Sequence, residues 1–309
     1  MLQAVCDDIA AMPGMSVVTT LEPRQPFSSN ADVIEVTSPD HETETFQHLL
    51  GKVDAVLVIA PETGGVLADR CRRVRAAGVA SWNCVPSAIE LCADKLALAV
   101  HLQAQGLPTI ATRPLDLSIP PSDWTRPFVL KPQDGAGSCL TFLIHRHDDW
   151  DLAVQSYREA GAFDRCLCQP FVSGRTLSVG INISLDGQRW EVLPVAEQHL
   201  SDDGRFRYLG GTIPARLSAV ESARIQDLVS AACHSIKGLA GYIGLDLILT
   251  NDGNPVIVEI NPRLTTSYIG YRRLLDTKIP FGWFATADAE TETKTIRTGE
   301  SVEFRLTPS

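Results

Sequence analysis

Two apolar segments near the C-terminal end of the chain are separated by four turn-forming residues, and they restrict the fold more than any other feature. The segments are residues 242–250 and 255–261, and the residues between them are Asn251-Asp252-Gly253-Asn254. Tight hairpin turns favour Asn, Asp and Gly, so the segments are predicted to pair as antiparallel strands. Pairing Thr250 with Pro255 across the turn places Asp246 directly opposite Glu259.

Side chains alternate between the two faces of a strand, so Asn261 is predicted to lie on the same face as Glu259. Carboxylates that lie directly opposite each other repel. Mg²⁺ compensates such a pair, because it takes one or two carboxylates and completes its shell with phosphates and water. The spacing therefore predicts metal ligands at Asp246, Glu259 and Asn261. The apolar side chains predicted for the other face are Leu245, Leu247, Leu249, Val256, Val258 and Ile260.

Two alternatives to this metal site remain open in the sequence. One carboxylate of the pair would form a buried ion pair with a nearby arginine such as Arg263. A register shift of one residue would instead send the two carboxylates to opposite faces of the hairpin.

The composition is that of a globular protein with a full core. The 309 residues suffice for about two domains or one large α/β enzyme. Hydrophobic residues make up 44% and charged residues 21%, which excludes a disordered chain and a small scaffold. Asp and Glu number 37 against 27 Lys and Arg, a formal net charge of −10. A chain this acidic has no general attraction to phosphate backbones or anionic membranes, so we expect neither nucleic acid nor a membrane among its partners.

The cysteines and the N-terminus both favour a cytoplasmic protein. The eight cysteines include no Cys-x-x-Cys pair, and the closest two, Cys166 and Cys168, would share one face of a strand. This spacing suits neither a zinc site nor a disulfide framework, so we expect small buried residues in a reducing compartment. The start of the chain carries Asp7 and Asp8 and no basic residue, so no signal peptide is predicted.

The first part of the chain alternates predicted strands and helices, which is typical of βαβ units and an α/β fold. Such domains usually begin with a strand, so the opening helix indicates that a leading strand is missing or that the start is short. The predicted strands are 16–20, 33–36, 53–60 and 78–82, of which 53–60 is a nearly continuous apolar run, and the predicted helices are 1–12, 65–77 and 86–105.

Beyond a proline-containing connection at 114–127, the pattern is first mixed and then antiparallel. The mixed part has strands at 128–131, 140–144 and 166–172 and a helix at 148–160. The antiparallel part has strands at 176–185, 190–198 and 208–214, a turn at Asp186-Gly187, and a helix at 219–238 before the hairpin. Residues 285–309 are predicted to form a peripheral tail with one strand at 301–306.

A candidate phosphate site lies in the mixed part. The chain has no GxxxxGK[ST] motif and no GxGxxG after a strand, so Walker-type and dinucleotide-fold sites are not supported. Instead, Lys131 ends an apolar strand and precedes a loop with Gly135, Gly137 and Ser138, and Lys95 is a candidate second cation. Small residues allow backbone N–H groups to close around an anion, and lysine supplies a point charge. Each feature alone is more typical of a solvated strand end or an ordinary turn.

The order of these features is more informative than any one of them. Asp94-Lys95 on a helix precedes the strand with Lys131 and its glycine-containing loop, and the segments QPFVSG, GLDLIL and VEINPR follow in turn. With this order, over about residues 80–275, the sequence resembles the ATP-grasp superfamily. The stretches EINPRLTTSYIGY and MLQAVCDDIAAMPG resemble a subgroup of carboxylate–amine ligases that includes tyramine–glutamate ligase.

The resemblance implies a fold of the α/β (α+β) class. A Rossmann-like pre-ATP-grasp domain is followed by two α+β lobes that grip ATP between them. The implied domains are 1–88 for the N-terminal α/β domain, 89–172 for the small lobe, 173–284 for the C-terminal lobe with the Mg/ATP site, and 285–309 for the tail.

The resemblance also implies a role for each candidate side chain. Two lysines hold the phosphates of ATP, a mobile loop covers them, a hinge reads adenine through its backbone, and three oxygen ligands hold two Mg²⁺ ions, with Mn²⁺ as an alternative. Arg263 faces the reacting phosphoryl or acyl group and, with Lys131, is implied to be catalytic. The other implied residues are Lys95 for phosphate, Gly135, Gly137 and Ser138 for the loop, Gln169, Phe171 and Val172 for the hinge, and Asp246, Glu259 and Asn261 for the metal.

Two positions depart from the pattern of the superfamily. Gln169 stands where an acidic residue is common, and Thr176 stands where a glutamate often contacts the ribose. Both departures affect nucleotide preference and affinity more than the chemistry.

The implied reaction joins a small-molecule carboxylate to an amine. The carboxylate attacks the γ-phosphate of ATP to give an acyl phosphate and ADP, and the amine then displaces phosphate to give an amide. Two alternatives are an ATP-binding regulatory module without ligase activity and an ATP-dependent carboxylase or phosphotransferase on the same fold. The sequence also allows for a homodimer.

Two further segments have a functional and a structural interpretation. Gly64-Gly65 follows the apolar run 53–60, and it lines the substrate cleft if that cleft lies at the carboxyl ends of the strands. Residues 205–211 either contact the acceptor or form an exposed basic hairpin tip.

Overall fold

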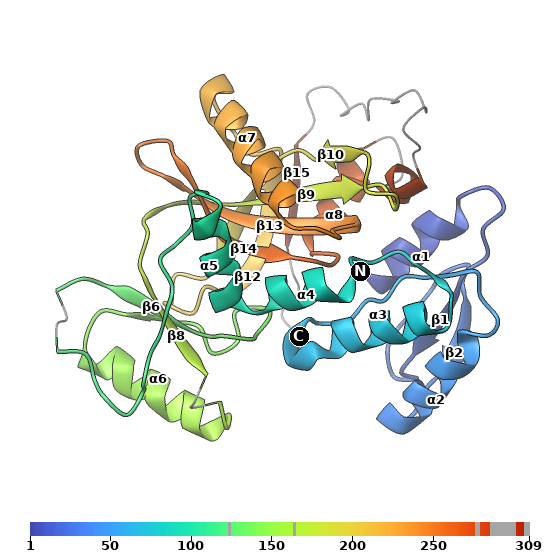
Figure 1. Cartoon of the computed structure of the whole chain (residues 1–309), viewed down its shortest axis with the longest axis horizontal. Coiled ribbons are helices and arrows are strands. Elements are labelled where there is room, and N and C mark those ends of the chain that lie inside the picture. The colour runs from blue at the N-terminus through green and yellow to red at the C-terminus, as the bar shows by residue number, and fades with distance from the viewer. Residues whose placement is uncertain (123–124, 163–164, 276–278, 285–300, 306–309) are drawn as a thin grey trace.

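The computed structural model describes residues 1–309 except 123–124, 163–164, 276–278, 285–300 and 306–309. Three bodies lie side by side in Figure 1, in the order N-terminal domain, large sheet and small lobe. The large sheet in the middle is covered by α7 (Ala219–Ser235), and α6 (His147–Glu159) marks the small lobe. Among the described residues, no helix combines the length and apolar character needed to cross a membrane.

The N-terminal domain has parallel strands with helices around them, as the alternation predicts. The run 53–60 forms a strand of only two residues, much shorter than predicted. One helix, α2 (Pro39–Leu49), was not predicted, and it has no buried residue that would give it an apolar periodicity. The pairs are β1 (Val18–Leu21) with β2 (Asp32–Glu35) and β3 (Ala55–Val56) with β4 (Ala80–Ser81), and the other helices are α1 (Leu2–Ala10) and α3 (Val66–Ala76).

The helix predicted over 86–105 is two helices, α4 (Pro86–Ala93) and α5 (Lys95–Ala104). The backbone of Asp94 is extended, with φ −85° and ψ 99°, and its carboxylate accepts hydrogen bonds of 3.0 Å from the backbone N–H groups of Leu96 and Ala97. Aspartate is a preferred N-cap, so it starts a second helix at a place where the apolar periodicity predicts a single continuous helix. Lys95 is consequently the first residue of α5 and does not lie in the middle of a helix.

The small lobe is a four-stranded antiparallel sheet covered by α6. Trp150 and Tyr157 of α6 are buried against Leu130 and Phe142 of the sheet. The strands are, in spatial order, β5 (Arg113–Pro114), β8 (Cys166–Pro170), β6 (Phe128–Pro132) and β7 (Phe142–Ile144).

The large sheet has the order β14-β13-β9-β11-β12-β15, and β10 also pairs with β9. The strand predicted over 190–198 is two strands, β10 and β11, which both pair with β9. The strand predicted over 301–306 is confirmed as β15, and its Phe304 is buried. The bounds are β9 (Gly174–Ile183), β10 (Trp190–Val192), β11 (Ala196–Leu200), β12 (Tyr208–Ile213), β13 (Gly241–Thr250), β14 (Pro255–Asn261) and β15 (Val302–Arg305).

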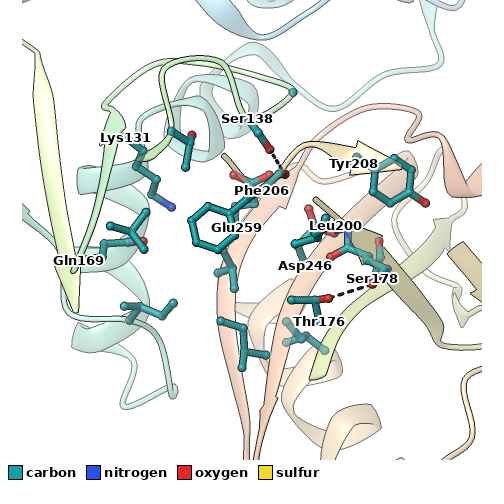
Figure 2. A pocket seen from close by; sticks show the side chains of 18 of the residues that line it. Lys131, Ser138, Gln169, Thr176, Ser178, Leu200, Phe206, Tyr208, Asp246 and Glu259 are labelled. Carbon is teal, nitrogen blue, oxygen red and sulfur yellow. Dashed lines mark hydrogen bonds between the residues drawn. The ribbon is translucent and has the colours of Figure 1, made fainter. Parts of the chain in front are cut away.

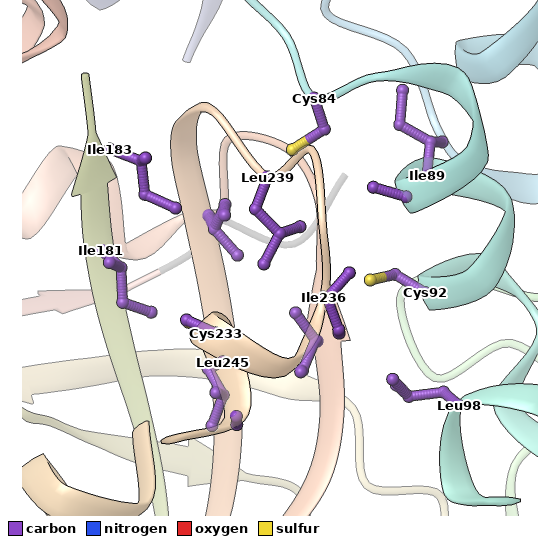
Figure 3. Close-up of a cluster of buried hydrophobic side chains, with 14 of the residues drawn as sticks. Cys84, Ile89, Cys92, Leu98, Ile181, Ile183, Cys233, Ile236, Leu239 and Leu245 are labelled. Carbon is purple, nitrogen blue, oxygen red and sulfur yellow. The ribbon is translucent and has the colours of Figure 1, made fainter. Parts of the chain in front are cut away.

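The largest core lies between the sheet and the helices that cover it. Figure 3 shows Ile181 and Leu245 of the sheet facing Cys233 of α7, with Ile89 and Cys92 of α4 close by. Seven of the eight cysteines are buried, as predicted. The exception is Cys139, which is exposed in the loop after β6.

Candidate active site

One cavity of about 730 Å³ lies between the small lobe and the large sheet. Its size lies within the usual range for small-molecule sites. Every site residue predicted from the sequence lines it, and so do side chains of β9, β11 and β12. Those predicted residues are Lys95, Lys131, Gly135, Gly137, Ser138, Gln169, Phe171, Val172, Asp246, Glu259, Asn261 and Arg263.

The predicted hairpin forms, and Asp246 lies directly opposite Glu259. The pairing next to the turn differs from the prediction, because Pro255 pairs with Leu249 and not with Thr250. A bulge after Asp246 makes up the difference of one residue.

The bulge also changes which side chains face the core. Ile257 is buried in the core, whereas Val258 lines the cavity, so the prediction that Val256 and Val258 share the core face with Leu245 was wrong.

Hydrogen bonds hold the carboxylate of Asp246 from two sides. Asn261 Nδ2 donates to Asp246 Oδ2 at 3.0 Å and lies 3.5 Å from Glu259 Oε1. On the other side, Gln198 Nε2 donates to Asp246 Oδ1 at 3.0 Å. Ser178 of β9 pairs directly with Asp246 and also lines the cavity. Three oxygen-bearing side chains therefore converge, as predicted, on one patch of the sheet. Figure 2 shows two of them, Asp246 and Glu259.

Burial and mutual repulsion make this patch electrostatically costly. Burial and, after it, repulsion by the neighbouring Glu259 together raise the pKa of Asp246 to about 7. Burial acts in the same direction on Glu259, but Lys95 and Lys131 outweigh it, so the pKa of Glu259 is lowered. A divalent cation bound by the two carboxylates would offset their repulsion. In the part of the chain that the structure describes, no cluster of three or more His, Cys, Asp or Glu residues offers another metal site.

Two lysines face the carboxylates from the other side of the cavity. Lys131 of β6 is buried, and burial lowers its pKa to about 8 against the attraction of Glu259, while Lys95 adds repulsion. Lys95 Nζ donates to Gly135 O at 2.5 Å. The N-cap Asp94 helps to fix Lys95, because Asp94 Oδ2 accepts a 2.7 Å hydrogen bond from Gln133 Nε2 at the base of the loop.

The charges of the cavity are complementary to a metal–phosphate group. Across all described residues, no ion pair joins Lys95 or Lys131 to Asp246 or Glu259, although the four line one cavity. Phosphate oxygens fit the lysines, and a hard cation fits the carboxylates and the Asn261 amide. The residues present therefore fit Mg²⁺ bound together with phosphates.

The glycine-containing loop is fastened to the large sheet by an unpredicted contact. Ser138 Oγ donates to Phe206 O at 2.8 Å, as Figure 2 shows, and both residues adopt left-handed backbone conformations with φ of 60° and 54°. Such a conformation is uncommon for residues other than glycine, which indicates local strain.

The segment 201–207 therefore docks on the small lobe. Leu143 N donates to Gly204 O at 2.8 Å, and the Arg205 guanidinium lies 3.7 Å from the centre of the Phe142 ring. Of residues 205–211, Arg205 and Phe206 contact the small lobe, whereas Arg207 and Leu209 are exposed. The interpretation as an exposed hairpin tip therefore holds for only part of this segment, and acceptor binding by it stays a prediction.

The predicted hinge residues lie at the end of β8 and directly after it, and they line the cavity. Gln169 is buried, and its Nε2 donates to Thr112 Oγ1 at 2.8 Å. The Phe171 ring is stacked with Phe206, with centroids 6.5 Å apart. Val172 also lines the cavity. An apolar, partly aromatic end of this kind suits a flat heterocycle.

Arg263 forms an ion pair, but not with the carboxylates of the hairpin. Its partner is Glu62 of the N-terminal domain, which accepts from Arg263 Nε and, at 3.2 Å, from Arg263 Nη2. The alternative of an ion pair between Arg263 and Asp246 or Glu259 was therefore wrong.

Sequence reasoning missed Gln198 and Glu62, and it named Phe206 only as part of the segment 205–211, which had two interpretations. Glu62 follows the apolar run 53–60. Because ligands bind at the carboxyl ends of parallel strands, its position after this predicted strand was a signal that could have found it. Gln198 had no local signal, because a cross-strand contact brings it to Asp246, and the contact of Phe206 with Ser138 depends on the docking of its loop.

Comparisons with known proteins agree with this geometry. The family model of the ATP-grasp domain matches residues 92–267, and that of the pre-ATP-grasp domain matches residues 15–89. A tyramine–L-glutamate ligase from Methanocaldococcus jannaschii is 24% identical over 245 residues, which are 79% of this chain and 67% of that protein. A D-alanine–D-alanine ligase from Bifidobacterium longum subsp. infantis is 25% identical over 284 residues, 83% of this chain and 70% of that protein. The chain thus spans about two thirds of the length of these relatives.

The fold is also similar to that of a solved ligase. The crystal structure of L-amino acid ligase from Bacillus licheniformis superposes with a TM-score of 0.76 and 15% sequence identity, and covers 96% of this chain and 76% of that one. The predicted ATP-grasp fold with a preceding pre-ATP-grasp domain is therefore confirmed. Because the family model of the ATP-grasp domain matches more than half of the residues of this chain, the chain belongs to the ATP-grasp family.

Proposed function

We propose that the chain is an ATP-dependent ligase that activates a small-molecule carboxylate as an acyl phosphate and joins it to an amine. The observation that carries this proposal is the pair of lysines, Lys95 and Lys131, facing the carboxylates of Asp246 and Glu259 across one cavity. The relatives named above are ligases, which supports ligation over an ATP-binding module without enzymatic activity.

In the first step, a carboxylate oxygen of the substrate attacks the γ-phosphorus of ATP, and the bond to the bridging oxygen of ADP breaks. Lys95 and Lys131 hold and neutralise the phosphates, and Ser138 and its loop cover them. Bound Mg²⁺ supplies further neutralisation of phosphate charge, and Asp246, Glu259 and Asn261 are the residues that would hold it, as two ions or with Mn²⁺ as a substitute.

In the second step, the amine nitrogen attacks the acyl carbon, the amine loses a proton, and phosphate leaves with the electron pair of the broken carbon–oxygen bond. Arg263 stabilises the negative charge that develops on the acyl and phosphoryl oxygens. The docked segment 201–207 and the loop exclude water, which would otherwise hydrolyse the acyl phosphate.

The adenine would lie at the hinge between Phe171, Phe206 and the backbone of Gln169 to Val172, for which the apolar lining of the cavity is the support. We also propose a cytoplasmic location, which the free state of all eight cysteines supports. The homodimer stays a prediction.

The test measures ADP and phosphate release from Mg-ATP by the pure protein with pooled carboxylic acids and pooled amines. Hydroxylamine replaces the amines in a parallel sample, because it converts an acyl phosphate into an acyl hydroxamate that is detected by mass spectrometry. We expect release only when a carboxylate and an amine are both present, and none with Glu259→Gln. Glu159→Gln, an exposed residue on α6, is the matched control.

The same experiment separates the alternatives. ADP release that needs bicarbonate but no amine would identify a carboxylase. Transfer of phosphate to a stable product without an amide would identify a phosphotransferase. Binding of Mg-ATP with no release in any pool would favour the regulatory module.

A further inference from the structure

A loop of the N-terminal domain contacts Arg263, which lines the cavity of the candidate site. Residues 57–65 connect β3 to α3, and their last part includes the short helix η1 (Thr63–Gly65). Glu62 contacts Arg263 next to the metal ligands, and Gly64 contacts the base of the glycine-containing loop. We propose that Glu62 is a positioning residue that fixes the orientation of Arg263. This inference rests on the proposed function, in which Arg263 stabilises the reacting groups.

The contact between Glu62 and Arg263 fixes most of the guanidinium. The side chain of Glu62 is 6% exposed and that of Arg263 22% exposed. Both carboxylate oxygens accept, one from Nε and the other from Nη2, and Arg263 Nη1 donates to Leu264 O at 3.2 Å. The fork of an arginine engaged in this way cannot turn about its last bonds without breaking several hydrogen bonds. Arg263 therefore presents one defined edge to the cavity.

A second contact fixes the loop that carries Glu62. Gly64 N donates to Asp134 Oδ2 at 2.7 Å, so the loop is fastened to the small lobe as well as to Arg263. Gly64 and Gly65 have φ of 64° and 71°, values that side chains other than that of glycine rarely allow. The two glycines let the chain turn tightly enough after Glu62 to bring the amide of Gly64 to Asp134.

Stability alone does not explain this ion pair. A buried ion pair contributes little net stability, because desolvation of both charges offsets their attraction. Besides Glu62, the carboxylates of Glu259 and Asp246 also act electrostatically on Arg263. Glu62 thus keeps the guanidinium from turning toward the metal ligands and occupying the place of the cation.

The test compares Glu62→Gln with Glu42→Gln, a matched control that breaks another Glu–Arg pair of the same domain, the one with Arg70. Two quantities are measured. The first is the Hε–Nε signal of Arg263 in ¹⁵N-arginine-labelled protein, assigned by its loss in Arg263→Lys. The second is substrate-dependent ADP release, with kcat and the KM for ATP determined separately.

In Glu62→Gln we expect the Arg263 signal to move and to exchange faster with water. We expect kcat to fall by about 10- to 100-fold, the range usual for loss of a supporting contact, with the KM for ATP within about twofold. Glu62→Asp keeps the charge, so its kcat is expected to lie between those of Glu62→Gln and the wild type. If Glu62→Gln does not fold, Glu62→Asp takes its place in both measurements. Glu42→Gln is expected to match the wild type.

An unchanged Arg263 signal in Glu62→Gln would overturn the inference, and so would an equal loss of kcat in the control. The signal does not depend on turnover. If no substrate pool gives ADP release, the proposed function fails, and the signal alone still decides whether Glu62 positions Arg263.

Discussion

Lys131 of β6 and Glu259 of β14 face each other from opposite sides of the cavity, and each shifts the titration of the other. The lysine lowers the pKa of Glu259, and the glutamate partly opposes the effect of burial on Lys131. Two strands of different lobes thus contribute opposite charges with space for a ligand between them. The following predictions test the consequences of this arrangement.

Replacement of Lys131 by methionine is expected to weaken ATP binding and to stabilise the ligand-free protein at neutral pH. Burial lowers the pKa of Lys131 from 10.5 to about 8, so the folded state binds this proton less tightly than the unfolded state. The resulting cost, about 3 kcal/mol, is fully present below pH 8 and disappears as the pH rises toward 10.5.

Thermal unfolding between pH 7 and pH 10 checks this prediction, with Lys52→Met, an exposed position, as the control. The Tm advantage of Lys131→Met over the wild type is expected to shrink with rising pH. An advantage that stays constant over this range, or is absent at pH 7, would contradict the assigned cause.

Replacement of Asp246 by asparagine is expected to abolish turnover without loss of stability. A metal ligand contributes several kcal/mol to catalysis, so we expect kcat to fall by at least about 100-fold. Because burial and repulsion by Glu259 together raise the pKa of Asp246 to about 7, removal of its charge is expected to leave Tm unchanged or higher. Steady-state kinetics and thermal unfolding are compared with Asp252→Asn, in the exposed turn of the same hairpin. Activity near that of the wild type would refute the metal assignment.

Binding of Mg-ATP is expected to protect Cys139 from alkylation. This thiol is exposed and lies in the glycine-containing loop, whereas the other seven cysteines are buried. Closure of the loop over phosphates slows the reaction, and a tenfold slowing corresponds to about 1.4 kcal/mol of preference for the closed loop. Mass spectrometry of iodoacetamide-treated protein measures the rate, with Cys139→Ser as the blank. Equal rates with and without Mg-ATP would rule out closure of the loop.

The hydrogen bond from Ser138 to Phe206 is expected to restrain the same loop before any ligand binds. A hydrogen bond of this kind contributes about 1 kcal/mol, so Ser138→Ala is expected to speed the alkylation of Cys139 by about fivefold in the free protein. Ser118→Ala, on an exposed loop of the chain, is the control. No acceleration in Ser138→Ala would show that Phe206 does not hold the loop.

Replacement of Gln169 by glutamate, the acidic type common at this position in the superfamily, is expected to destabilise this chain. Gln169 is buried and donates to Thr112 Oγ1, which itself donates to Ile110 O. A glutamate would lose that donor and bury a charge, at a cost of about 1–3 kcal/mol. Chemical denaturation checks this against Gln188→Glu, an exposed position. A variant as stable as the wild type would mean that another group satisfies the carboxylate.

The sequence predicted the partners in the hairpin correctly through two compensating differences. The pairing at the turn is displaced by one residue from the predicted one, and the bulge after Asp246 displaces it back. Val256, Ile257 and Val258 are all apolar, so alternation cannot reveal which of them faces the core. The position of the carboxylates was therefore predictable, whereas the bulge between them and the turn was not.

Contacts between distant segments were the part that local patterns did not predict. The N-cap at Asp94 was visible as a residue type, but the apolar periodicity on both sides of it suggested one continuous helix. Phe206 reaches the cavity only because segment 201–207 docks on β7, and Glu62 becomes part of the site only through Arg263. Such placements depend on the packing of whole lobes, which no short sequence window contains.

The strand β13 serves the core and the cavity with alternate residues. Leu245 and Leu247 belong to the largest core, and Asp246 between them lines the cavity. In a saturation mutagenesis library of this strand, sorted separately for abundance and for activity, loss of abundance and loss of activity alone would therefore alternate from one position to the next. Substitutions at the leucines would remove the protein from the cell, and substitutions at the aspartate would leave it abundant and inert. On this strand, the side chains that face the cavity can therefore change independently of the core only one position at a time.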